Sequence, residues 1–176
     1  MISLSNISTA LNLRSYFSIR RNPERSKPMR KDVHTIILQP NVEFDTYWKD
    51  TGKVGAGPTV AIYAYEIEIL RFDCFGVLKG HYHVFSDLCN KQSDEHRISF
   101  KETTREEQID RTIWEIENNL LSLIRLIANN RIRSIEIDRN SLKNIIPQLK
   151  KSLEKQHERV SSHLKQKKDD IKNNTI

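Results

Sequence analysis

Short apolar and alternating runs fill the first half of the chain and predict a set of β-strands. The runs cover residues 34–39, 42–48, 59–75, 81–85 and 96–100. The third run is longer than an ordinary strand of about 5–6 residues, so we expect a hairpin turn near 64–66. Pro40 and the glycines between Gly52 and Gly80 mark the other turns. The short connections favour antiparallel pairing.

After residue 103 the apolar period changes to that of a helix. Apolar side chains recur at steps of three and four residues: Ile109, Ile113, Ile116, Leu120, Leu123 and Ile127. Thr103 and Thr104 are each followed three residues later by a glutamate, which is the capping-box pattern. We therefore predict a helix over about 104–129. A second stripe through 142–164 predicts a basic C-terminal helix with Pro147 near its start, where a missing N–H is harmless.

Strands followed by helices predict an α+β fold, a small, mostly antiparallel sheet packed by the 104–129 helix. We divide the chain into a basic, disordered leader (1–32), an α+β core domain (33–138) and a basic helical extension (139–176). Their net charges are +5, −5 and +6. Basic ends favour contact with nucleic acid or an acidic partner. Solvated tails, or tails packed on the acidic body, account for the same charges.

Cysteine usage and hydropathy indicate in which cellular compartment the protein is expected. Cys74 and Cys89 are the only two cysteines, and no secretory apolar segment precedes them, so we expect a reducing cytoplasm. No apolar run approaches the roughly 20 residues that span a bilayer, so no membrane partner is expected. The Ser- and Arg-rich start also fits a transit peptide. Phosphate-loop and dinucleotide motifs are absent from the sequence, and we predict no cofactor.

The segment 71–83 carries the strongest candidate chemistry. His81 and His83 are two residues apart, so on a strand both imidazoles leave the same face. Arg71 and Asp73 share a strand face in the same way and can form an ion pair. Acid–base catalysis by the two histidines, with Arg71 or Lys79 stabilising a phosphorane-like anion, would give metal-independent RNA cleavage.

Two other roles for the histidine pair stay open. As metal ligands, His81 and His83 would need a third donor such as Asp73 or His96. As structural residues, they would pack and hydrogen-bond on a half-buried strand. We predict no metal ligand.

A second candidate site is basic. Five cations are candidate nucleic-acid contacts, one beside the histidines and four on the C-terminal helix: Lys79, Lys150, Lys151, Lys155 and Arg159. A solvated amphipathic helix, or a helix that docks on a protein partner, has the same pattern.

The block Arg71-Phe-Asp…Gly80-His-Tyr-His83, followed by a loop, a short strand and a long helix, resembles the TumE-like toxins of bacterial toxin–antitoxin modules and related small bacterial proteins. The resemblance covers about 60–125. It implies a cytosolic effector that acts on RNA and is neutralised by an antitoxin protein. Arg71, Asp73, His81 and His83 are the positions that match. Cys74-Phe75 departs from the small polar residue usual there, and the basic C-terminal helix has no counterpart.

These patterns lead to one hypothesis with two rivals. The leading hypothesis is a toxin-like cytoplasmic effector that cleaves or binds RNA through its His-x-His site; as an enzyme it would be a metal-independent ribonuclease. The first rival is a non-catalytic adaptor that holds nucleic acid or a protein partner on its basic C-terminal helix. The second is a structural subunit of an oligomer.

Overall fold

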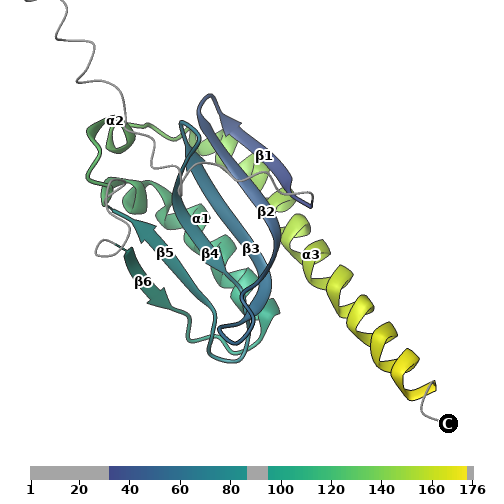
Figure 1. The fold of residues 1–176 in the computed structure, drawn as a ribbon. Helices are drawn as coiled ribbons and strands as arrows, with labels where there is room; N and C mark the ends of the chain where they lie inside the picture. The colour runs from purple at the N-terminus through teal and green to yellow at the C-terminus, as the bar shows by residue number, and fades with distance from the viewer. Residues whose placement is uncertain (1–31, 87–94, 174–176) are drawn as a thin grey trace, which may run out of the picture.

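The computed structural model describes residues 32–86 and 95–173. Its six strands are β1 (His34–Gln39), β2 (Val42–Asp50), β3 (Ala56–Ala64), β4 (Ile67–Asp73), β5 (His81–Phe85) and β6 (Glu95–Ser99). They form one sheet in the order of the sequence, and each strand pairs antiparallel with the next (Figure 1). The α+β prediction is therefore confirmed, including the division of the run 59–75 into two strands.

Three helices follow the sheet: α1 (Arg105–Arg125), α2 (Asn130–Arg133) and α3 (Arg139–Asn173). The predicted capping box forms at Thr104, whose side chain accepts from the backbone N–H of Glu107 while the Glu107 carboxylate accepts from the N–H of Thr104. Helix α1 ends four residues before the predicted position, with Leu126 as its C-cap. Asn129 then caps the separate helix α2.

The main core lies between one face of the sheet and two helices. Helices α1 and α3 both run behind the sheet in Figure 1. Phe44, Ile62 and Phe72 from the strands are fully buried, as is Ile116 of α1. Leu153 of α3 is fully buried in the same cluster. The sequence predicted only the first helix on this face, whereas α3 covers it as well.

Helix α3 begins at the first residue of the predicted helical extension, so Pro147 lies inside the helix and the prediction that it lies near the helix start is wrong. The carboxylate of Asp138 accepts hydrogen bonds from the backbone N–H groups of Asn140 and Ser141, at 3.1 and 3.2 Å, and these bonds start the helix at Arg139. The helix therefore continues across a residue that cannot donate a backbone hydrogen bond.

Two glycines allow close approaches that help to position the strands. A Cβ atom at Gly57 would lie 2.0 Å from the carbonyl oxygen of Cys74, next to the end of β4. A Cβ atom at Gly80 would lie 2.1 Å from the side-chain oxygen of Gln108 in α1. Glycine is required at position 57, where a larger residue would have to move the backbone, whereas at position 80 a larger residue would have to displace the end of the Gln108 side chain.

Several predictions fall on residues outside the described ranges. The leader 1–32, apart from Asp32, lies outside them, and so do Cys89 and residues 174–176. The domain boundaries at 32 and 138 stay predictions. Within the described chain, none of the helices combines the length and apolarity needed to cross a bilayer.

Candidate functional site

The pairing of β4 with β5 brings the four predicted site residues together. In the antiparallel register Asp73 lies opposite His81, and Arg71 lies opposite His83. The intervening residues, Phe72 and Tyr82, point into the core beneath the helices. Because neighbouring side chains on a strand alternate between faces, Arg71, Asp73 and both histidines lie on the opposite face of the sheet.

One carboxylate oxygen, Oδ2 of Asp73, is the centre of this group. It lies 3.2 Å from Nε of Arg71, 3.3 Å from Nε2 of His83 and 3.5 Å from Nε2 of His81. The predicted Arg71–Asp73 ion pair is therefore present, and both imidazoles are beside it. Arg71 also pairs with Glu68 at 3.0 Å, which holds the guanidinium in place.

Sequence reasoning missed three further members of the site. The ammonium of Lys49, from β2, lies 3.0 Å from Oδ2 of Asp73, and Thr59 of β3 donates to Oδ1 at 2.8 Å. Arg97 of β6 lies beside His81, with NH2 3.3 Å from Nδ1. Only the strand pairing reveals these neighbours. We call Lys49, Arg71, Asp73, His81 and His83 the His–Asp cluster.

Solvent reaches the His–Asp cluster mainly through its cations. The side chains of Lys49 and Arg71 are 19% exposed, against 4% for His81, 7% for His83 and none for Asp73. A substrate would therefore meet the ammonium and guanidinium groups first. The imidazoles are almost completely buried, so a substrate would reach them only if neighbouring side chains moved.

Two phenylalanines flank the imidazoles. Phe75 makes an edge-on contact with His81 at 5.6 Å between ring centroids, and Phe85 stacks on His83 at 5.7 Å. The guanidinium of Arg71 lies 5.2 Å from the centre of the Phe85 ring. Apolar rings around charged groups lower the local dielectric constant, which strengthens the electrostatic interactions between those groups.

The surrounding groups keep Asp73 ionised. Burial by itself raises the pKa of this carboxyl group. The hydrogen bond with His83 and the charges of Arg71 and Lys49 outweigh burial, so the pKa lies well below its usual range. Burial also lowers the pKa of Lys49, although the charge of Asp73 opposes that effect.

Both histidines are neutral at physiological pH. Burial lowers the pKa of His83 to about 4, even though its hydrogen bond with Asp73 favours the charged form. Burial also lowers the pKa of His81. The proton of His81 sits on Nδ1, because that atom lies 2.7 Å from the carbonyl oxygen of Lys79, which can only accept. The longer 3.3 Å contact with Arg97 is therefore not a hydrogen bond, and Nε2 of His81 carries a lone pair.

The lowered pKa of His83 predicts a specific loss of stability in acid. Between pH 6.5, its ordinary pKa, and about 4, the unfolded chain binds a proton at His83 that the folded chain does not bind. The free energy of unfolding should therefore fall as the pH is lowered through this window. Urea unfolding of wild type and His83→Gln at several pH values measures this fall in the free energy of unfolding. The variant should show a shallower fall over the same window, and equal slopes would contradict the assignment.

Among the described residues, one group could hold a metal ion: Asp73, His81 and His83. One ligand atom from each lies within 4.8 Å of the others. Two imidazoles and a carboxylate suit a divalent transition metal. Lys49 and Arg71 already contact the same carboxylate oxygen, and their positive charges would oppose a cation there. The predictions of no metal ligand and no cofactor stay predictions.

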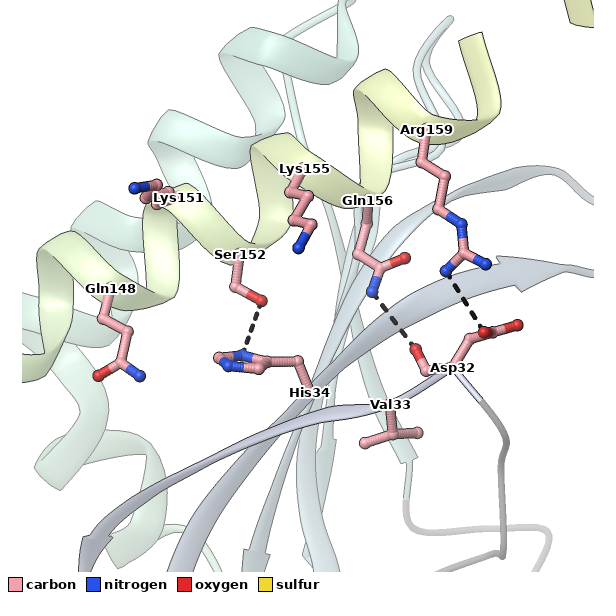
Figure 2. Close-up of a pocket in the computed structure, with 9 residues that line it drawn as sticks. All are labelled: Asp32, Val33, His34, Gln148, Lys151, Ser152, Lys155, Gln156 and Arg159. Atoms are coloured by element: carbon pink, nitrogen blue, oxygen red, sulfur yellow. Dashed lines mark hydrogen bonds and ion pairs between the residues drawn. The ribbon is translucent and has the colours of Figure 1, made fainter. Parts of the chain in front are cut away.

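The five basic candidates do not form one surface. Lys79 donates to the carbonyl oxygen of Lys53, beside the sheet. On α3, Lys150 pairs with Asp110 of α1 at 2.7 Å. Lys151, Lys155 and Arg159 instead line a cavity on the side of α3 that faces the start of β1 (Figure 2).

A family described as a domain of unknown function (DUF7700) matches residues 2–153. The chain belongs to this family. The match includes the sheet, α1, α2 and the first part of α3. No curated protein and no solved structure matches the chain significantly. The family match does not link the chain to the TumE-like toxins.

Proposed function

We propose that this DUF7700 protein is a toxin-like cytoplasmic effector that binds and cleaves RNA at the His–Asp cluster. The observation that carries the proposal is the convergence of two imidazoles, a guanidinium and an ammonium on the carboxylate of Asp73. Cations attract and orient a phosphodiester, and a neutral imidazole accepts a proton from a hydroxyl group. The resemblance of the segment 71–83 to TumE-like toxins supports the same proposal and suggests an antitoxin partner.

The protonation states assign the roles. His81 is the general base, because its Nε2 lone pair can take the proton of the ribose 2′-hydroxyl group. That oxygen then attacks phosphorus, and the bond from phosphorus to the 5′-oxygen breaks. The guanidinium of Arg71 stabilises the phosphorane-like anion.

The leaving 5′-oxygen needs a proton. His83 was a candidate acid from sequence, but with a pKa of about 4 it is a neutral imidazole at neutral pH and lacks the acidic second proton of an imidazolium. Lys49 is the better donor, because its ammonium lies in the same cluster and its pKa is lowered. Asp73 holds these groups in place and balances their charge.

Loss of the base should slow cleavage strongly while the fold persists. His81→Ala should lower the rate of cleavage of a labelled RNA by about 10²-fold or more. It should also relieve any inhibition of growth on induced expression, with total RNA followed in parallel. His96→Ala, an exposed histidine on the neighbouring strand β6, is the matched control and should cleave at the wild-type rate. Circular dichroism verifies that each variant is folded.

Three outcomes would overturn this mechanism. The first is equal cleavage by His81→Ala and wild type, and the second is no cleavage by either. The third is loss of cleavage in a chelator with recovery on addition of a divalent metal, which would reassign Asp73, His81 and His83 as metal ligands.

One observation favours the adaptor hypothesis. Lys151, Lys155 and Arg159 are exposed and lie along one side of α3. Deleting residues 139–176 cannot test it, because Leu149 and Leu153 of α3 are fully buried in the core. Charge reversal at Lys151 and Lys155 tests it instead, since it leaves the core intact. Loss of RNA or partner binding in that variant, with cleavage chemistry absent from wild type, would favour the adaptor.

A further inference from the structure

A cavity of about 460 Å³ lies between the start of β1 and one side of α3 (Figure 2). It exists because Leu149 and Leu153 hold α3 on the sheet, which leaves the neighbouring helix positions facing the edge of β1. Its size falls within the range of small-molecule sites, roughly 300–1,000 Å³. We call it the α3 pocket.

The lining of the α3 pocket is cationic. Lys151, Lys155 and Arg159 are four residues apart, so they project from the same side of the helix on successive turns. Figure 2 shows the ammonium of Lys155 directed toward β1 across the pocket. Among the described lining residues, Asp32 supplies the carboxylate, and it pairs with Arg159 at 3.3 Å. Lys151 and Lys155 form no ion pair with a described residue, so the pocket has an excess of two positive charges.

Buried polar side chains fix the walls of this pocket. Ser152, only 8% exposed, contacts Nδ1 of His34 at 3.0 Å and the hydroxyl group of Thr46. Gln156, 9% exposed, donates to the backbone carbonyl of Asp32 at 3.3 Å. These bonds tie the helix to the first two strands, so the pocket is formed before a ligand arrives.

We propose that the α3 pocket binds a phosphate monoester as its dianion. A phosphate monoester carries a charge of about −1.5 to −2 at pH 7, which matches the excess of two positive charges. Lysine and arginine are the usual donors to phosphate oxygens, and a carboxylate monoanion would leave one cation unbalanced. The volume leaves room for the group that carries the phosphate. The pocket shares no residue with the His–Asp cluster, so this inference stands apart from the proposed function.

Binding of adenosine 5′-monophosphate to the full chain tests the proposal. We expect calorimetry at constant ionic strength to detect binding of this nucleotide and none of adenosine. Lys155→Glu should weaken the binding by about tenfold or more, since it replaces one donor with a repelling charge. Lys143→Glu is the matched control: it makes the same charge change at an exposed position of α3 outside the pocket, and it should change the affinity by less than about twofold.

Further ligands identify the source of the phosphate. The ligands are inorganic phosphate, a short RNA with a 5′-phosphate, and the same RNA with a 5′-hydroxyl group. Binding of each is followed by the NMR shifts of the backbone amides of His34 and Ser152. Shifts with any phosphate monoester, lost in Lys155→Glu, support the proposal. Equal binding of adenosine and its monophosphate, equal loss in the Lys143 and Lys155 variants, or no binding of any phosphate would each overturn it.

Discussion

Replacing Asp73 with alanine is expected to destabilise the fold by about 3–5 kcal/mol. The carboxylate is completely buried and accepts contacts from Lys49, Arg71 and Thr59. Its removal leaves an ammonium and a guanidinium close together, largely out of water and without their shared counter-ion. Since small domains are stable by only about 5–15 kcal/mol, much of the native state would be lost. Urea unfolding of wild type and variant measures the difference.

An exposed ion pair provides the control for this loss. Asp110 pairs with Lys150 at 2.7 Å, but the two side chains are 63% and 43% exposed. Asp110→Ala should therefore cost at most about 1 kcal/mol. If Asp73→Ala were as mild as Asp110→Ala, Asp73 would not be the group that balances the cations, and the electrostatic account of the His–Asp cluster would be wrong.

The strands and the main helix could be predicted because their periods are local. The turn between β3 and β4 shows where local signals weaken. Tyr65 and Glu66 adopt positive φ angles of 52° and 65°, in place of the Asn-Gly or Asp-Gly pair that usually marks such a turn. Only the length of the run 59–75 pointed to this hairpin.

The His–Asp cluster could be predicted only in part, for a reason rooted in sheet geometry. Alternate side chains of a strand lie on the same face, so the sequence alone places Arg71 beside Asp73 on one strand and His81 beside His83 on the next. The register between strands depends on turns and packing along the whole sheet, and it alone brings Lys49 and Thr59 to Asp73. The near-complete burial of the imidazoles likewise follows from neighbours on other strands and cannot be read from the segment 71–83.

Helix α3 shows the same limit for helices. Its apolar stripe was visible in the sequence, but a stripe does not reveal which surface it covers. Leu142, Leu149 and Leu153 pack into the main core, so the first part of α3 is integral to the fold. Its basic side chains therefore stand in fixed positions beside β1, which is what makes the α3 pocket a defined site.

Phe72 should fix the register on which the His–Asp cluster depends. Phe72 lies between Arg71 and Asp73 in the sequence. Its side chain is fully buried and stacks on Tyr82, with 4.9 Å between the ring centroids. Tyr82 in turn lies between His81 and His83. The Phe72–Tyr82 contact on the core side therefore holds β4 and β5 in the alignment that faces Asp73 toward both imidazoles on the other side.

Phe72→Ala is accordingly expected to cost about 3–5 kcal/mol in urea unfolding and to loosen the cluster. NMR titration should show the pKa of His83 rising from about 4 toward its ordinary value of 6.5, since a looser site admits water. Phe72→Leu, which keeps most of the volume, should be milder on both measures. Trp114→Ala, at a half-exposed position on α1, should cost about 1 kcal/mol or less and leave the histidine unchanged. An unaltered His83 pKa in Phe72→Ala would show that the core contact does not set the register of the site.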